Sequence, residues 1–188
     1  VSHRMDREKK HMTRQGTQSI QLNGWTWRIR IPAGSGPFPL ILLLHGWTGD
    51  ENSMWIFADR LPKDSMLIAP RAPHATPLGG YGWHPHKTKA WPWVDDFKPA
   101  VEALNGMLDE HQFSQADISR FSLVGFSQGA ALAYTYALLN PERVLALAGL
   151  SGFLPDGAGL LAAGQPLLDV PVFMAHGAQD EIVPVSRA

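Results

Sequence analysis

The segment spanning residues 121–139 constrains the fold more than any other part of the sequence. An apolar run at 121–125 leads into Gly125-Phe126-Ser127-Gln128-Gly129, and a stretch rich in small residues follows. This order predicts a strand, a sharp turn and a helix at 128–139. Asn140-Pro141 should end that helix, because the residue before a proline disfavours the helical region. The glycines would let strand and helix approach closely, so that the Ser127 side chain projects above the sheet.

A turn of this kind is typical of a serine nucleophile, because the positive end of the following helix points at the hydroxyl group. The alternative is a serine that only caps a helix after a tight turn. In a chain with 18 glycines the Gly-x-Ser-x-Gly string arises easily by composition. The strand before it and the helix after it therefore carry the interpretation, and Ser127 is the predicted nucleophile.

The rest of the chain repeats the alternation of strands and helices. Asn23-Gly24 favours a two-residue hairpin turn between strands at 19–22 and 25–31. Further apolar runs predict strands at 40–44, 66–69, 121–125, 144–150 and 172–175, and helices are expected at 52–60, 98–111 and 128–139. The pattern predicts an α/β fold with a mostly parallel central sheet and helices on both faces. The aromatic, Pro- and Gly-rich segment 70–92 reads as a structured loop over a site.

Length and composition limit the number of domains and the kinds of partner that the chain is expected to bind. A length of 188 residues favours one domain, and a net charge of −1 gives no basis for binding nucleic acid or an anionic membrane surface. No apolar run is long enough to span a membrane. Residues 1–16 are expected to be a flexible arm or a remnant of cloning, and residues 17–188 the folded domain. Without an apolar leader segment, a cytoplasmic location is the default expectation.

The strand at 40–44 ends in His45-Gly46-Trp47, where a turn would aim backbone amides inward. An oxyanion hole needs one N–H from the residue after the nucleophile and one from the loop after the third strand. Gln128 and Trp47 are the predicted donors. Two interpretations are possible for His45: a catalytic base, or a turn histidine that hydrogen-bonds the loop backbone. The second is favoured.

An acid is expected after a late strand, following the serine in chain order. Asp180 follows the strand at 172–175 and is the predicted triad acid, whereas Asp169 precedes that strand and Asp156 lies in a Gly- and Pro-rich loop. Glu181 is the neighbour most easily confused with it. An exposed loop acid without a catalytic role is the alternative for Asp180.

The histidine that should complete such a triad has no candidate after Asp180. The eight histidines are His3, His11, His45, His74, His84, His86, His111 and His176. His176 is expected below the site at a strand end, while His84 or His86 could approach the mouth of the site as an unusual base. The favoured expectation is that the histidine, with a last strand and helix, belongs beyond Ala188.

Five segments in order resemble the phospholipase/carboxylesterase family of α/β-hydrolases, close to the acyl-protein thioesterases. They are LLLHGWTGDENSM, APRAP with GGYGW and WPWVDDF, GFSQGAALAY, LSGFLP and HGAQDEIVPVSRA. The resemblance implies hydrolysis of esters or thioesters through an acyl-enzyme, without a metal or organic cofactor. It implies Ser127 as nucleophile, Asp180 as acid, the Trp47 and Gln128 amides as oxyanion donors, and a catalytic histidine one helix and one strand after the Val-Pro.

Aromatic residues gather in the loops expected on the site's side of the sheet. The predicted substrate pocket consists of Trp83, Trp91, Trp93, Phe153 and Leu154, with Trp47, Trp55 and Tyr81 in the same loops. Packing in the core is the alternative for any one of them. Together they favour an apolar pocket for a small, hydrophobic ester as the small-molecule partner.

The expected activity is therefore that of a serine carboxylesterase. Three alternatives stay open: a binding domain that lacks its histidine, an acyl thioesterase and a lysophospholipase. Without a further strand, the apolar strand at 172–175 would form an open sheet edge, which favours a homodimer or a strand-swapped oligomer.

Overall fold

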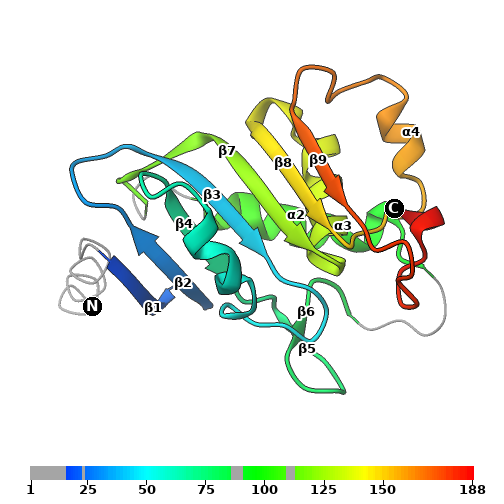
Figure 1. Cartoon of the computed structure of the whole chain (residues 1–188), viewed down its shortest axis with the longest axis horizontal. Coiled ribbons are helices and arrows are strands. Elements are labelled where there is room, and N and C mark those ends of the chain that lie inside the picture. The colour runs from blue at the N-terminus through cyan, green and yellow to red at the C-terminus, as the bar shows by residue number, and fades with distance from the viewer. Residues whose placement is uncertain (1–15, 23, 86–90, 109–112) are drawn as a thin grey trace.

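The structure, a computed structural model, describes residues 16–22, 24–85, 91–108 and 113–188. One sheet contains β1 (Gly16–Leu22), β2 (Trp25–Ile31), β3 (Phe38–Leu44), β4 (Met66–Pro70), β7 (Ala116–Phe126), β8 (Val144–Leu150) and β9 (Val172–Ala175). Its strand order is β1-β2-β4-β3-β7-β8-β9 (Figure 1). From β4 to β9 the neighbouring strands are parallel, which confirms the predicted sheet.

The hairpin at the N-terminal side is also confirmed. β1 and β2 pair antiparallel, with Leu22 opposite Trp25, and β2 then pairs antiparallel with β4. Gly24 in the connection has a φ of +82°, a conformation that glycine adopts without strain. Residues 1–15 of the predicted arm lie outside the described residues, and Gly16 is the first residue of β1.

Side chains of β3 alternate between two layers, as the two-residue period of a strand requires. Leu40, Leu42 and Leu44 belong to the main core, which also contains residues of α2 (Val94–Met107) and α3 (Gln128–Leu139). Ile41 and Leu43 belong to a smaller cluster with residues of the 3-10 helix η1 (Ser53–Arg60). Helical segments therefore cover both faces of the sheet, as predicted (Figure 1).

The helix predicted at 128–139 is confirmed as α3, whereas the other two predicted helices differ in kind or in bounds. The segment predicted as a helix at 52–60 forms η1, a 3-10 helix. The helix predicted at 98–111 begins at Val94, because the Asp96 carboxylate accepts a hydrogen bond of 2.9 Å from the Trp93 N–H and caps the first turn. β7 is longer than the predicted 121–125.

Several short elements had no sequence prediction. They are β5 (His74–Ala75), β6 (Tyr81–Gly82), η2 (Pro141–Arg143) and α4 (Ala158–Ala162). A 3-10 helix, η3 (Val185–Arg187), follows the Val-Pro. β5 and β6 form a small hairpin inside the segment 70–92, of which residues 86–90 lie outside the described residues. Three of the predicted site residues, Trp83, Trp91 and Trp93, lie between β6 and α2. The others follow the carboxyl ends of β3, β7, β8 and β9. These ends share one edge of the sheet because the four strands are parallel.

Candidate active site

Ser127 stands alone between β7 and α3 in a strained backbone conformation. Its φ is +51° and its ψ is −117°, a region that L-residues rarely adopt. The Ser127 N–H donates to the Leu150 carbonyl at the end of β8 (2.9 Å), and the Ser127 carbonyl accepts from Ala130 and Ala131 in the first turn of α3. These bonds hold the turn that the sequence predicted, with its strand before and its helix after.

The two glycines of the motif permit this turn for steric reasons. A Cβ atom on Gly125 would overlap the carbonyl oxygen of Gly129. A Cβ atom on Gly129 would overlap the carbonyl oxygens of Leu44 and His45, at the end of β3. The start of α3 therefore lies directly against the end of β3, and only glycine fits at both contacts.

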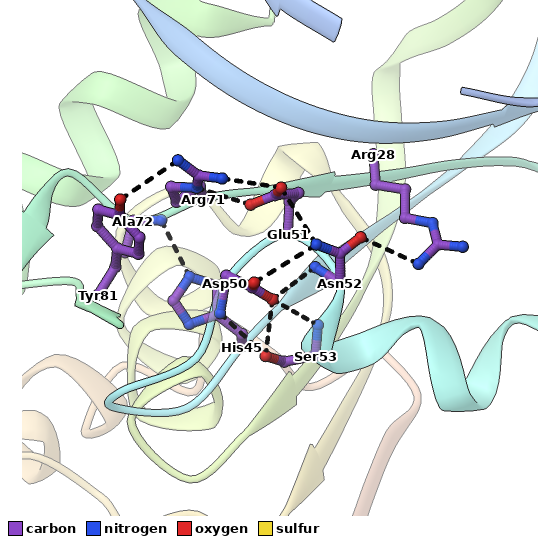
Figure 2. Close-up of polar contacts among 9 residues, drawn as sticks. All are labelled: Arg28, His45, Asp50, Glu51, Asn52, Ser53, Arg71, Ala72 and Tyr81. Atoms are coloured by element: carbon purple, nitrogen blue, oxygen red, sulfur yellow. Dashed lines mark hydrogen bonds and ion pairs between the residues drawn. The ribbon is translucent and has the colours of Figure 1, made fainter. Parts of the chain in front are cut away.

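His45 uses both ring nitrogens on the backbone of neighbouring loops. Its Nδ1 donates to the Gly46 carbonyl (2.7 Å), and its Nε2 accepts from the Ala72 N–H (3.0 Å; Figure 2). The ring is 1% exposed, and desolvation by burial lowers its pKa. A neutral ring with both nitrogens occupied cannot take a proton from Ser127, which confirms the turn-histidine interpretation.

The peptide that links Gly46 to Trp47 lies beside the serine. An ideal Cβ atom on Gly46 would come within 3.3 Å of the Ser127 Cβ and 3.0 Å of the Phe126 ring. Gln128, the other predicted oxyanion donor, is the first residue of α3 and 6% exposed. Gln128 thus follows Ser127 directly, and Gly46, which precedes Trp47, lies against Ser127. The role of the Trp47 and Gln128 amides at the oxyanion stays a prediction.

Gln128 and Trp83 connect this region through their side chains. The Gln128 Oε1 accepts from the Trp83 backbone N–H (2.9 Å), and the Trp83 indole nitrogen donates to the His45 carbonyl (2.7 Å). Trp83, predicted as a pocket residue, is 1% exposed and belongs to the main core. It supports the loop behind Ser127.

Asp180 lies in the loop after β9 and presents one carboxylate oxygen to the backbone. Its Oδ1 accepts from the N–H groups of Ile182 and Val183, both at 2.9 Å. The bond from Val183, with that from Ile182, lowers the pKa of Asp180, so the carboxylate is ionised at neutral pH. Asp180 and Ser127 follow parallel strands that flank β8, at the same edge of the sheet.

His176 comes within 3.8 Å of the Asp180 Oδ2 through its Nε2 atom. The same Nε2 atom donates to the Val183 carbonyl at 2.7 Å. The ring therefore supports the loop that carries Asp180. Of the two other histidines weighed as a base, His84 packs edge-on against Phe97 and its Nδ1 donates to the Pro85 carbonyl, while His86 lies outside the described residues.

Comparison with known protein families matches residues 31–188 to the phospholipase/carboxylesterase family model. The chain belongs to this family. An acyl-protein thioesterase 1 from Debaryomyces hansenii is 31% identical over 177 residues, covering 82% of this chain and 75% of the relative. The corresponding protein of Yarrowia lipolytica is 27% identical over 171 residues, with the same coverage.

Solved structures share the fold of this chain. The crystal structure of esterase PE8 superposes with a TM-score of 0.63 at 26% identity, covering 92% of this chain and 80% of that one. Acyl-protein thioesterase 2 from Zea mays gives a TM-score of 0.65 at 22% identity, covering 86% and 79%. The chain has the α/β-hydrolase fold, and its family identifies it as a hydrolase.

The remaining predicted pocket residues lie around the loop after β8. Phe153 is 5% exposed and packs against Trp91, with ring centroids 5.0 Å apart. Trp93 is 56% exposed and Leu154 is 43% exposed. The Arg187 guanidinium lies 4.6 Å from the centroid of the Trp91 ring. Two of these four residues therefore pack mainly inside the protein, and two face solvent.

The sequence did not predict a partly buried ion pair between Glu51, at the end of the 45–51 loop, and Arg71. Glu51 is 4% exposed, and Arg71 forms two hydrogen bonds to its carboxylate (Figure 2). Both residues lie in segments that carry the family resemblance, DEN and APRAP, and this was the only sign in the sequence that they have a role.

Membrane spans were sought among the described helices, and none has the length and apolar character that a span requires. The cytoplasmic location stays a prediction.

Proposed function

We propose that this hydrolase is a serine carboxylesterase that cleaves small, hydrophobic carboxylic esters through an acyl-enzyme on Ser127. The observation that carries the proposal is the strained turn at Ser127, held between the end of β8 and the first turn of α3. A non-glycine residue in such a conformation persists only where the surroundings enforce it, and such strain is concentrated at functional sites.

In the proposed reaction the Ser127 hydroxyl attacks the ester carbonyl and transfers its proton to a general base. The Trp47 and Gln128 N–H groups stabilise the oxyanion of the tetrahedral intermediate, each contributing about 3 kcal/mol. Collapse of the intermediate releases the alcohol, which takes the proton back from the base, and leaves an acyl-enzyme. Water then attacks the acyl group in the same way and releases the acid.

Asp180 is proposed to orient the general base. Its Oδ1 is held by two backbone N–H groups, which leaves Oδ2 as the oxygen suited to a histidine Nδ1–H. His176 is assigned to support of this loop, because its Nε2 donates to Val183. The resemblance places the base histidine after Asp180 in chain order.

A small hydrophobic ester is the proposed substrate because apolar side chains follow the end of β8, where the Leu150 carbonyl accepts from the Ser127 N–H. Trp91 and Phe153 form an aromatic pair next to the exposed Leu154 and Trp93 side chains. Apolar and aromatic walls with few polar groups are typical of pockets for small organic ligands. The acyl-protein thioesterases among the relatives support a second candidate, hydrolysis of acyl thioesters on proteins.

The test is hydrolysis of short-chain p-nitrophenyl esters by the protein and by Ser127→Ala. We expect Ser127→Ala to lose activity on the order of 10⁶-fold and to lose labelling by a fluorophosphonate probe. Ser119→Ala, an exposed serine on β7, is the control and should change neither. Equal low rates in the protein and in Ser127→Ala would favour a binding domain instead. A rate that rises steadily with acyl-chain length would favour the thioesterase or lysophospholipase alternatives.

The outer strand of the sheet supports a proposal on assembly. β9 is the last strand of the sheet in the described part of the chain, and Val172, Phe173 and Met174 are 46%, 61% and 46% exposed. An apolar edge strand with unpaired backbone groups favours pairing with another strand. A homodimer or strand-swapped oligomer through β9 is therefore proposed for this chain.

A further inference from the structure

A partly buried ion pair ties the loop beside Ser127 to the segment after β4. The Arg71 Nε atom donates to the Glu51 Oε2 at 2.7 Å, and the Arg71 Nη2 atom donates to Oε1 at 2.9 Å. Two parallel bonds between a guanidinium and a carboxylate fix direction as well as distance. The Glu51 side chain is 6% exposed and that of Arg71 is 29% exposed, so solvent screens the pair only partly.

Two consecutive residues, Arg71 and Ala72, hold the two ends of the 45–51 loop. At the start of the loop, His45 Nε2 accepts from the Ala72 N–H at 3.0 Å. At its end, Glu51 binds Arg71, the residue directly before Ala72 (Figure 2). Because positions 71 and 72 are consecutive, the ion pair fixes the loop's end relative to its start. The Gly46-Trp47 peptide beside Ser127 lies between these two anchors.

The middle of the loop is held by a residue that Arg71 also contacts. The Tyr81 N–H donates to the Gly49 carbonyl at 2.9 Å. The Arg71 Nη1 atom donates to the Tyr81 hydroxyl at 3.3 Å, and the guanidinium carbon lies 4.7 Å from the centroid of the Tyr81 ring. Arg71 therefore connects the end of the loop with the strand that holds its middle.

The loop needs such support because its backbone is strained. Thr48 has a φ of +68°, which is unfavourable for a β-branched residue. Gly80 packs against the Thr48 carbonyl so closely that a Cβ atom there would overlap it. A strained conformation of this kind persists only when several contacts enforce it together.

We propose that Glu51 and Arg71 are a positioning pair that holds the 45–51 loop so that the Trp47 amide faces the oxyanion formed at Ser127. The inference rests on the proposed function and deepens it. Neither residue touches the reacting atoms. Their effect passes through the loop backbone, and a displacement of about 1 Å at a catalytic group is enough to lower the rate on the order of 10²-fold.

The test compares Glu51→Gln and Arg71→Lys with Asp59→Asn, which breaks the exposed Lys63–Asp59 pair. In Glu51→Gln we expect kcat for a short-chain p-nitrophenyl ester to fall on the order of 10²-fold while KM stays within about twofold. Affinity for an aryl trifluoromethyl ketone, which forms an oxyanion on Ser127, should fall by the same factor. Arg71→Lys keeps the charge but loses the paired bonds, so its loss should be intermediate.

Different results separate the two proposals. If Ser127→Ala retains activity, the proposed function fails. If Ser127→Ala is inactive but Glu51→Gln behaves like Asp59→Asn, only the positioning role fails. A rise in KM at constant kcat would also overturn that role, because it would indicate substrate binding. If Glu51→Gln does not fold, Arg71→Lys and Tyr81→Phe are measured in its place. Unchanged affinity for the ketone in both variants would overturn the positioning role.

Discussion

The indole nitrogen of Trp83 donates a hydrogen bond of 2.7 Å to the carbonyl oxygen of His45, and the two rings pack with centroids 5.0 Å apart. The Trp83 backbone N–H donates to the Gln128 side chain in the same place. One tryptophan therefore joins the loop after β3 to the start of α3. Ser127 lies directly before Gln128, so this contact bears on the stability of the site.

Replacing Trp83 with phenylalanine should destabilise the protein. The variant keeps an aromatic ring against His45 but leaves the buried His45 carbonyl without its donor, a loss of about 1–3 kcal/mol. Urea unfolding followed by circular dichroism measures this free energy. Trp93→Phe is the control, because Trp93 is 56% exposed. A Trp83→Phe curve that overlays the control's would contradict the prediction.

The close approach at Gly129 gives a sharper steric prediction. An alanine there would place a Cβ atom against the carbonyl oxygens of Leu44 and His45, so α3 must shift away from β3. We expect Gly129→Ala to lose esterase activity and to lower the midpoint of thermal unfolding. Gly159→Ala in α4 is the matched control, since a Cβ atom there meets nothing within 4 Å. Similar behaviour of both variants would refute this account of the turn.

The strained turn at Ser127 was predictable because its sequence is local: an apolar strand, two glycines and a small-residue helix. The start of helix α2 is not predictable from periodicity, because it depends on the Asp96 cap and on Trp93 as the N-cap residue. The Glu51–Arg71 pair was missed for a different reason. Its members are 20 residues apart and meet only when β4 packs beside β3, which is a tertiary relationship.

Burial of His45 predicts how stability depends on pH. Desolvation lowers the folded-state pKa of His45, whereas the unfolded chain binds a proton near the ordinary value of 6.5. The stabilising contribution is therefore complete above this value and is lost as the pH falls below it. Between about pH 7 and pH 5, the unfolding free energy should decrease, and less so in His45→Gln. An equally steep decrease in His45→Gln would assign the effect to other groups.

The role of Asp180 is separable from that of its neighbour Glu181. In Asp180→Asn the amide oxygen still accepts from Ile182 and Val183, so the loop should keep its shape. Loss of the charge should lower kcat on the order of 10⁴-fold, because the base loses its orienting carboxylate. Glu181→Gln is the control at the adjacent, exposed position. Equal rates in the two variants would mean that the acid lies elsewhere.

The edge strand β9 gives the last prediction. Phe173 is 61% exposed on this strand and borders an open apolar groove of about 300 Å³ whose walls include Ile41, Val124 and Ala148. We expect the 188-residue chain to form dimers or larger oligomers in light scattering after gel filtration. Phe173→Lys should shift it towards the monomer, because a charge on an edge strand opposes pairing with another strand.

Ile182→Lys tests whether the shift is specific to that edge. Ile182 is 86% exposed but lies in the loop beyond β9, so the same substitution there adds an equal charge without altering the strand. It should leave the oligomer unchanged. A wild-type chain that is monomeric at every concentration tested would exclude pairing through β9. A shift of equal size in both variants would instead attribute the association to net charge.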